Sequence, residues 1–371
     1  MRDFTDDDPV DRLRLIRSRR VGAVTFHRLV KEHGSVRAAL DALPEVARAA
    51  GVTDYHPCPV EVAHHELAQA RLSGATMSVP GDGVYPPQLA LLPDAPPLLW
   101  VRGDAQLLCR QMIAMVGARN ASSLGLRMAR RMAMTLGRAG QVVVSGLARG
   151  IDAEAHDATL PTGTVAVMAG GVDVIYPEEN AALYSRIVET GCIVSEQAMG
   201  LVPQARHFPL RNRIIAGMAR AVVVVEAAAR SGSLITARDA LDMGKDVMAV
   251  PGHPFDARAA GCNLLLRDGA VLVRGAEDVL EVTGNGASAA QDQVPSLAQT
   301  IPRSGPERRT LGETSALHDR ILARLGASPV AEDQLIRDLA LPAETVAQGL
   351  VMLEVDGLVL RQPGGMISRL N

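Results

Sequence analysis

Hydrophobic positions along the chain follow two different periods. From about residue 10 to 75, apolar residues fall at helical spacings and predict short helices, as at Leu13, Ile16, Val21, Val24, Phe26, Leu29 and Val30. From Met112 onward, short apolar runs rich in β-branched residues alternate with helix-like stretches. This alternation predicts an α/β fold with a doubly wound parallel sheet that carries helices on both faces.

The alternating region also predicts individual elements. We expect strands at 112–117, 142–145, 164–168, 192–194, 221–225, 246–250 and 270–273. We expect helices at 125–138, 151–159, 179–189, 211–219 and 234–243. The proline-rich segment 80–97 is expected to be a linker that leads into this sheet.

The last part of the chain predicts a separate small domain. Small and polar residues dominate from about 283 to 314, which indicates a flexible linker. Three helices near 315–325, 331–339 and 343–355, followed by a β-hairpin, are typical of a winged helix. We therefore expect an N-terminal helical domain, a sheet domain, a linker and a winged helix, with bounds 1–79, 80–282, 283–314 and 315–371.

One stretch of the sheet domain predicts an anion site. The strand Val142–Ser145 leads into the glycine turn Gly146–Gly150, and a helix begins near Ile151 with Asp152 in its first turn. A strand, a tight turn and a helix N-terminus together offer free N–H groups and a positive dipole to an anion. Arg149 adds a full positive charge. An ordinary βα turn of an α/β core remains an equally good interpretation of this stretch alone.

Positive charge is concentrated near this turn. The formal net charge of the chain is −3, yet residues 110–151 contain seven Arg and residues 197–225 contain four, and neither segment contains Asp or Glu. Such a distribution favours a polyanion over a single small anion as the partner. Aromatic residues make up only 2% of the chain, which argues against a surface built mainly on base stacking.

Composition and missing motifs narrow the class of protein. The chain is 47% hydrophobic and 21% charged, which is typical of a globular protein, and no apolar run approaches the ~20 residues of a membrane span. The acidic first eight residues lack a signal-peptide core, and the four Cys lie far apart, so we expect a cytoplasmic protein with reduced thiols. Because neither a G-x-G-x-x-G nor a Gly-Lys-Ser/Thr motif follows a strand, we expect no cofactor, and we expect no metal.

A second Arg-rich segment offers further phosphate ligands. Arg211 and Arg213 bracket Asn212 at an expected helix start, and Phe208 lies just before them. Arg suits bidentate phosphate contacts, and a Phe ring can stack on a base. The alternatives are that Asn212 caps the helix, that Arg211 forms structural ion pairs and that Phe208 belongs to the core.

Two glycine-containing turns stay ambiguous. The run Ser231-Gly232-Ser233 opens a predicted helix, where the hydroxyls either cap the helix or bind an anion. The segment Val21–Val24 resembles a helix-hairpin-helix or sterile-alpha-motif turn, a type that can touch DNA phosphates. For the N-terminal module we favour a small packing or interaction domain.

Seven motifs occur in a fixed order along the chain. They are Val-Gly-Ala-Arg (116–119), Ser-Gly-Leu-Ala-Arg-Gly-Ile-Asp (145–152), Gly-x-Asp-x-x-Tyr-Pro (171–177), Ser-Glu (195–196), Phe-Pro-x-Arg-Asn-Arg-Ile-Ile-Ala-Gly (208–217), Ser-Gly-Ser-Leu-Ile-Thr-Ala (231–237) and Val-Pro-Gly (250–252). This series closely resembles the bacterial DNA-processing protein A (DprA/Smf) family over about residues 80 to 280, and more weakly at both ends.

The resemblance implies an extended Rossmann domain that binds single-stranded DNA, forms a homodimer and loads the RecA recombinase during natural transformation. Single-stranded DNA-binding protein is a further candidate partner. Together with the residue-based candidates, the family's pocket predicts DNA contacts at Gly117, Arg119, Ser145, Gly146, Arg149, Gly150, Arg206, Phe208, Arg211, Asn212, Arg213, Ser231, Gly232 and Ser233. Relatives often have a basic residue where this chain has Glu178 and a Lys where it has Ala205. Either the adjacent Arg206 replaces that Lys, or this chain has a weaker or shifted phosphate track.

By the same resemblance, the dimer interface includes Asn263, Leu266 and Leu272, and RecA contacts Leu241 and Arg267. An independent argument concerns the three consecutive Leu residues at 264–266. Neighbours on a helix point about 100° apart, so the three cannot all face one core. At least one is expected to face outward, unless neighbouring elements absorb all three.

Two other functions remain open. A nucleotide-processing enzyme of the phosphoribohydrolase type could use Glu226 or Asp152 as an acid–base group, although the Pro-Gly-Gly-x-Gly-Thr motif of those enzymes is absent. A transcription regulator could act through the winged helix. Its expected recognition helix, 343–355, holds Glu344 and Glu354 and no basic residue, which favours protein contact over sequence readout.

Overall fold

The computed structural model describes residues 8–284, 317–322, 325, 330–339, 341–362 and 366–369. The chain divides into two compact units, Met1–Gln291 and Asp292–Asn371. Beyond Gly284, the predicted linker lies outside the described residues. Among the described residues, no helix combines the length and the apolar character that crossing a membrane requires.

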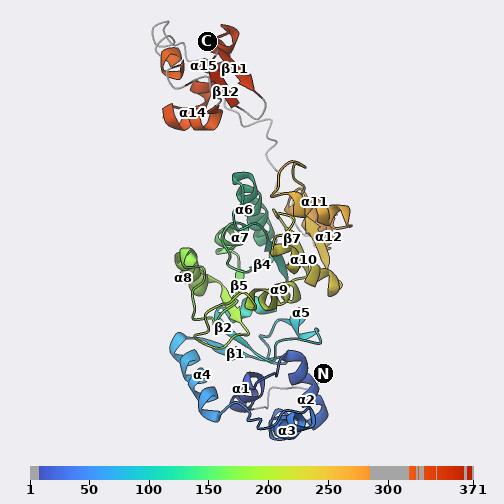
Figure 1. Cartoon of the computed structure of the whole chain (residues 1–371). Helices are drawn as coiled ribbons and strands as arrows, with labels where there is room; N and C mark the ends of the chain where they lie inside the picture. The colour runs from blue at the N-terminus through green and yellow to red at the C-terminus, as the bar shows by residue number, and fades with distance from the viewer. Residues whose placement is uncertain are drawn as a thin grey trace. The chain divides into compact units, whose positions relative to one another are not determined.

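A nine-stranded sheet forms the centre of the first unit (Figure 1), in the order β1-β2-β6-β5-β4-β3-β7-β8-β9. The predicted parallel strands are confirmed as β3 (Met112–Val116), β4 (Val142–Ser145), β5 (Thr164–Val167), β6 (Cys192–Ser195), β7 (Ala221–Val224), β8 (Asp246–Ala249) and β9 (Val271–Leu272). β3 is central, and the strand order reverses between β3 and β7. In a doubly wound sheet, this reversal is where ligands bind.

Both faces of the sheet are covered because its strands are apolar on both sides. Val142 and Val144 of β4 pack into the core on one face, and Val143 packs into the core on the other. The helices are α6 (Ser123–Arg138), α7 (Ile151–Thr159) and α12 (Ala276–Val282) on the Val143 face, and α9 (His207–Met218), α10 (Ser233–Asp242) and α11 (Ala260–Arg267) on the opposite one, with α8 (Ala181–Thr190) against β6. α9 begins four residues earlier than predicted, since Pro209 is tolerated in a first helical turn.

Segment 80–97 is a packed connection, and the linker prediction for it was wrong. Leu89, in the short helix α5 (Pro87–Ala90), is fully buried against α9, and the Tyr85 hydroxyl donates to the Pro96 carbonyl at 2.8 Å. Two strands that the sequence reading missed flank this segment, β1 (Thr76–Ser78) and β2 (Leu99–Gly103). They extend the sheet in antiparallel fashion through β6. The 3-10 helix η1 (Ala105–Cys109) then leads to β3.

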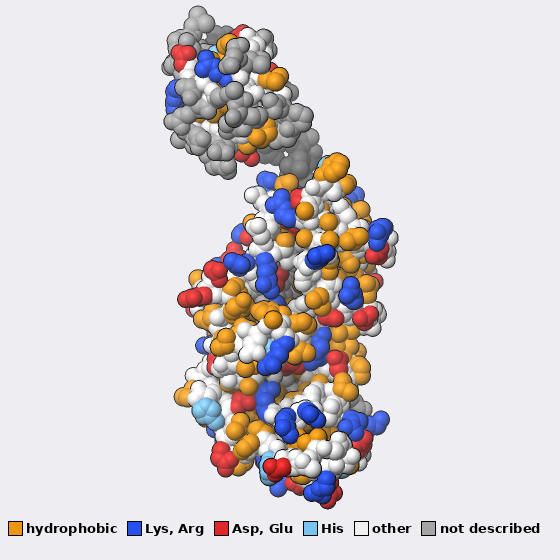
Figure 2. Space-filling model, viewed as in Figure 1, with side chains coloured by type: hydrophobic (Ala, Val, Ile, Leu, Met, Phe, Trp, Pro, Cys, Tyr) orange, Lys and Arg blue, Asp and Glu red, His pale blue; other side chains and the backbone are white. Residues whose placement is uncertain are grey.

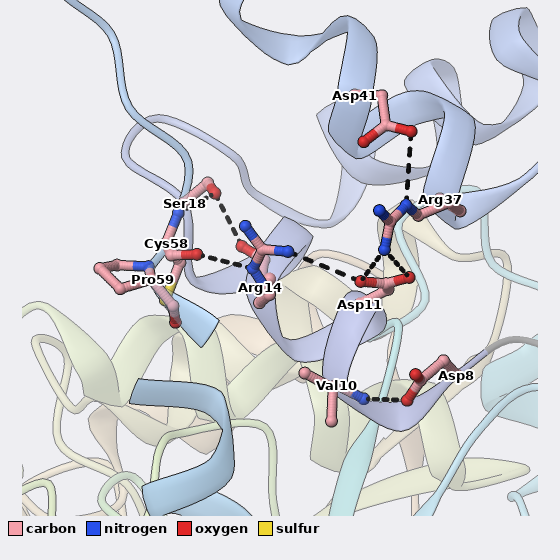
Figure 3. Close-up of polar contacts among 9 residues, drawn as sticks. All are labelled: Asp8, Val10, Asp11, Arg14, Ser18, Arg37, Asp41, Cys58 and Pro59. Atoms are coloured by element: carbon pink, nitrogen blue, oxygen red, sulfur yellow. Dashed lines mark hydrogen bonds and ion pairs between the residues drawn. The ribbon is translucent and has the colours of Figure 1, made fainter. Parts of the chain in front are cut away.

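Four helices form the N-terminal domain, α1 (Pro9–Arg17), α2 (Ala23–His33), α3 (Val36–Ala49) and α4 (Val60–Ser73). Phe26, Leu29 and Leu40 are among the residues of its apolar core. Figure 3 shows an ion pair between α1 and α3, in which Asp11 binds Arg37 at 3.3 Å, and a second pair within α3, in which Arg37 binds Asp41 at 3.4 Å. The helices of this domain are therefore tied together by both apolar and charged contacts.

The N-terminal domain also packs directly on the sheet. Leu13 of α1 and Trp100 of β2 belong to one buried cluster. Arg17 pairs with Glu66 at 2.8 Å and donates to the carbonyl of Glu196, which follows β6. The Gly22 turn lines a small cavity of about 190 Å³ together with Glu196. Arg17 and Arg213 line the same cavity, and both bond to Glu196, so these side chains join the module to the sheet domain, which agrees with a packing role for the N-terminal module.

The described residues of the second unit form a three-stranded sheet, β10-β12-β11, with helices at 317–322, α14 (Glu332–Leu339) and α15 (Ala343–Val355). The strands are β10 (Val330–Ala331), β11 (Val359–Gln362) and β12 (Met366–Arg369). Ile321, Leu350 and Ile367 are among its core residues. This arrangement confirms the predicted winged helix, while the rest of the predicted helix 315–325 and the hairpin turn 363–365 lie largely outside the described residues.

Candidate nucleic-acid interface

Two adjoining cavities open at the carboxyl edge of the parallel strands. The first, of about 380 Å³, lies beyond the ends of β4 and β5, and the second, of about 700 Å³, lies beyond β3 and β7, where the strand order reverses. Their linings share Arg119, Ala148, Phe208 and Arg211. These shared side chains form a partition between the two cavities, which we call the Arg–Phe partition.

An aromatic ring lies at the centre of the Arg–Phe partition. The guanidinium carbon of Arg119 is 5.4 Å from the ring centroid of Phe208, and that of Arg211 is 6.0 Å away. The ring of Tyr176, which lines the first cavity, has its centroid 5.8 Å from that of Phe208. Phe208 is half-buried and borders both cavities, so the structure does not support the alternative that it is a core residue.

Arg211 supplies a buried positive charge to this partition. Its side chain rises from α9, is 94% buried and donates from Nη1 to the Val167 carbonyl at 3.4 Å, whereas its Nε has no hydrogen-bond partner among the described residues. Burial lowers the pKa of Arg211, and the carboxylate of Asp152 acts in the opposite direction. A Cβ atom at Gly146 would overlap the guanidinium, so only glycine lets Arg211 lie against the turn.

The glycine turn itself offers fewer N–H groups than the sequence predicted. The N–H of Gly146 donates to Asp152 at 3.1 Å, that of Leu147 to His156 Nε2 at 3.3 Å, and that of Ile151 to a carbonyl at 3.2 Å. These three groups are therefore already bonded inside the protein. The anion site that the sequence predicts at this turn stays a prediction, with three of its N–H groups already bonded and with Arg149 and Arg211 lining the adjoining first cavity.

His156 stabilises the glycine turn through hydrogen bonds of its ring. Because its Nε2 accepts from Leu147, its Nδ1 carries the proton and donates to Thr164 Oγ1 at 2.7 Å. Burial lowers the pKa of His156 to about 3, so the imidazole is neutral at physiological pH. Burial raises the pKa of Asp152, and the charge of Arg211 opposes that shift. The buried side chains of Asp152 and His156 therefore both stabilise the conformation of the glycine turn.

The other predicted basic residues have different surroundings. Arg119 and Arg149 are exposed and line the first cavity, where Arg149 also forms a surface pair with Glu179 at 3.3 Å. Arg213 points away from both cavities and pairs with Asp94 at 3.3 Å and with Glu196 at 2.6 Å. Arg206 is exposed outside both linings and donates to the ring of the adjacent His207.

The second cavity contains most of the remaining candidates, whereas Ser145 and Gly150 line neither cavity, and Ser145 is fully buried with its hydroxyl donating to the Met115 carbonyl at 2.6 Å. Gly117, Asn212 and the run Ser231–Ser233 line it, and the Ser231 and Ser233 hydroxyls lie 2.7 Å apart. Asn212 donates to the Gly232 carbonyl at 3.3 Å, so its amide fixes this turn and does not cap α9. Arg230 and Arg258 also line this cavity and were missed by the sequence analysis. Arg230 could have been identified from the sequence, because it lies directly before the Ser-Gly-Ser run.

Not every Arg of the acid-free segment faces the cavities. Arg110 donates to the carbonyls of Thr162 and Gly140, and Arg130 pairs with Glu154 and Asp157. Figure 2 accordingly shows Lys and Arg side chains interspersed with acidic and hydrophobic ones on the face drawn there. Arg119, Arg149 and Arg211 line the first cavity together with the acidic Glu178 and Glu179, and the basic side chains do not form a continuous band on the face drawn in Figure 2.

The carboxylate of Glu226, which follows β7, is held by hydrogen bonds and an ion pair inside the protein. Its carboxylate accepts from the N–H of Ser122 at 3.0 Å and from the Ser122 hydroxyl at 3.1 Å, and it pairs with Arg258 at 3.3 Å. Ser122 caps α6. Glu226 thus joins the start of α6 to the rim of the second cavity.

Residues 76–284 match the family described as DNA recombination-mediator protein A. The chain belongs to the DprA/Smf family. Residues 6–69 match its N-terminal helix-hairpin-helix domain, and residues 305–365 match its winged helix domain. These matches confirm the predicted family and the nature of both terminal domains.

Several DprA/Smf relatives are similar over most of their length. Protein Smf of Synechocystis is 35% identical over 314 residues, which covers 78% of this chain and 79% of the relative. Protein Smf of Escherichia coli is 36% identical over 293 residues, which covers 78% and 76%. DNA processing protein DprA of Streptococcus pneumoniae is 41% identical over 223 residues, which covers 58% and 79%.

Two solved structures share the fold. The crystal structure of DprA from Streptococcus pneumoniae has a TM-score of 0.58 and 35% identity, and it covers 71% of this chain and 98% of its own. DprA from Helicobacter pylori has a TM-score of 0.52 and 28% identity, and it covers 57% and 96%. The Helicobacter pylori structure is described as giving insight into that protein's single-stranded DNA binding mode.

Proposed function

We propose that this chain is a cytoplasmic recombination mediator that binds single-stranded DNA in the two cavities, protects it and loads RecA onto it during natural transformation. The observation that carries this proposal is the Arg–Phe partition, in which two guanidinium groups flank one accessible aromatic ring. Such a combination suits a strand whose phosphate contacts Arg119 while an adjacent base stacks on Phe208.

Recessed cavities favour a single strand over a duplex. A base can reach an aromatic ring at a cavity wall only when it is unpaired and unstacked from its neighbours. A binding titration of single- against double-stranded DNA over a salt series tests this. We expect tighter binding of the single strand and a linear decline of log affinity with log salt. Equal or tighter binding of the duplex would contradict the proposal.

We propose a binding protein and not a nucleotide-processing enzyme. Asp152 is hydrogen-bonded inside the glycine turn, and Glu226 is held by Ser122 and Arg258. Both carboxylates that could act as acid–base groups therefore have structural partners. A turnover assay with nucleoside monophosphates and with single-stranded DNA tests this, and hydrolysis by the purified protein would overturn it.

We propose two protein contacts near α10 and α11. Leu241 is 54% exposed and Arg267 is also exposed, and both line a cavity of about 370 Å³ that would receive RecA. Leu266 and Leu272 would join two copies of the chain, and Leu264 faces outward, as the run of three Leu predicted. We propose that Asn263, whose side chain bonds to the backbone of Gly252, belongs to the same interface between the two copies. Single-stranded DNA-binding protein is a further proposed partner.

Replacing Phe208 with Ala is expected to weaken single-strand binding by about 1–3 kcal/mol, because one stacked base loses its platform. Since Phe208 is half-buried, thermal unfolding of the variant should change little. Fluorescence anisotropy and a melting curve provide the two measurements. A large drop in melting temperature would instead assign the ring to the core.

Removing residues 283–371 is expected to leave single-strand binding largely intact. The proposed DNA contacts all precede residue 283, and in the winged helix Arg361 is paired with Glu332 at 2.6 Å and lies 3.6 Å from Glu354. Val351 and Met352 on α15 are each 53% exposed, which favours a protein contact over a transcription regulator's groove contact. The measurement is the affinity of the folded, truncated chain for single-stranded DNA. Loss of most of this affinity would contradict the assignment of DNA binding to residues before 283.

A further inference from the structure

Phe255 is the most exposed large hydrophobic side chain among the described residues. It is 94% exposed and lies in the loop 250–259, between β8 and α11. The ring of His253 lies beside it, with 5.6 Å between the ring centroids and an angle of 40°. An aromatic pair held this far into solvent contributes little to the core, so its exposure needs another explanation.

The loop that carries Phe255 is braced by its own hydrogen bonds. The N–H of Phe255 donates to His253 Nδ1 at 3.3 Å, and the N–H of Asp256 donates to the His253 carbonyl at 2.9 Å. Arg258 donates to both carboxylate oxygens of Asp256 at 3.2 Å. A braced loop loses less conformational freedom when a ligand stacks on its ring than a loose one would.

The same loop is joined to the proposed DNA site. Arg258 pairs with Glu226 at 3.3 Å and lines the second cavity, only three residues from Phe255. β8 lies next to β7 in the sheet, so the loop leaves the same carboxyl edge on which both cavities open. Phe255 lies outside the lining of the second cavity, but it belongs to the same loop as Arg258, which is part of that lining.

We infer that Phe255, backed by His253, is an outer stacking platform for a base of a single strand that leaves the second cavity. This inference rests on the proposed function, and it lengthens the DNA site beyond the Arg–Phe partition. A ring face accepts any base, so the platform would add affinity without sequence preference. It would act only on a strand long enough to span from the partition to the loop.

The test compares Phe255→Ala and Phe255→Trp with the wild-type chain on oligothymidylates of about 6 and about 24 nucleotides. Leu72→Ala is the matched control, because Leu72 is 81% exposed and lies on α4 of the N-terminal domain. We expect Phe255→Ala to bind the long oligonucleotide about tenfold more weakly and the short one normally, and Leu72→Ala to bind both normally. Phe255→Trp should retain affinity, and its fluorescence should be quenched by the long oligonucleotide only, since the native Trp100 is buried.

Two results would overturn the inference while leaving the proposed function intact. One is unchanged affinity of Phe255→Ala for the long oligonucleotide. The other is a change from dimer to monomer in sedimentation that accounts for the whole loss, which would assign Phe255 to contact with a second copy of the chain. Failure of the wild-type chain to bind any single strand would instead remove the proposed function, and the inference with it.

Discussion

Reversing the charge of Arg119 and Arg149 together is expected to weaken single-strand binding by about a hundredfold, or about 3 kcal/mol. Arg119 belongs to both cavities, and Arg149 lines the first. Two Glu side chains would replace attraction for phosphate with repulsion at the point where the strand crosses the Arg–Phe partition. Both positions are exposed, so the fold should be retained.

The salt dependence makes this prediction specific. Each lost phosphate contact lowers the slope of log affinity against log salt by about 0.7 for a single strand, so the double variant should lose about 1.4. The loss should be similar for any base sequence, because phosphate contacts carry no sequence information. Binding titrations of Arg119→Glu/Arg149→Glu at several salt concentrations provide both values.

A matched pair of Arg residues controls for net charge. Arg127 and Arg131 are exposed on α6, within the same acid-free segment, but line neither cavity. Arg127→Glu/Arg131→Glu changes the net charge by the same amount and should bind nearly as well as the wild-type chain. Equal losses in the two double variants would mean that long-range charge, and not the partition, attracts the DNA.

The sequence predicted the parallel strands well because each is a short apolar run between turn residues. Val142–Val144 and Val222–Val225 are buried on both sides of the sheet. A continuous apolar run of this length and composition is typical of a buried parallel strand. The antiparallel strands β1 and β2, at the other end of the sheet, were missed for a physical reason as well. Prolines in 80–97 resemble those of a linker, although Leu98–Val101 is itself a buried apolar run that marks β2.

The candidate site was only partly predictable, because side-chain partners come from distant parts of the chain. Arg119 and Arg149 were identified from their positions after strand ends, where topology requires that they approach one edge. Asp94 lies 119 positions before Arg213, and nothing near Arg213 in the sequence predicts this pairing. In the fold, Arg213 therefore lies beside residues of the N-terminal domain. Likewise, the hydrogen bond from the N–H of Leu147 to His156 forms only in the fold, and it makes this N–H unavailable to an anion.

A second large effect is expected at the edge of the sheet. Leu272→Arg should convert a dimer into a folded monomer that binds a long single strand about a hundredfold more weakly. β9 is the last strand of the sheet, and its side chains Val271 and Leu272 are 39% and 49% exposed. An exposed apolar edge strand is suited to self-pairing about a two-fold axis, and an Arg there would oppose it.

Leu272 is a sharper probe of the dimer than Leu266. Leu266 packs partly against the apolar core, so a charge there would also endanger the fold, whereas Leu272 lies on the surface. The affinity for a short oligonucleotide should stay near normal, because each cavity pair remains complete within one chain. Only the gain that two linked sites give on a long strand should disappear.

Sedimentation of both chains and titrations with short and long oligonucleotides measure this effect. Leu72→Arg is the control, since it places the same charge at an exposed Leu of the N-terminal domain, far along the chain from β9. If the wild-type chain sediments as a monomer at the concentrations of the titration, the dimer is absent and the avidity argument fails. If Leu272→Arg is monomeric but binds long DNA normally, one chain alone provides the whole binding site, and dimerisation must serve a step other than DNA capture.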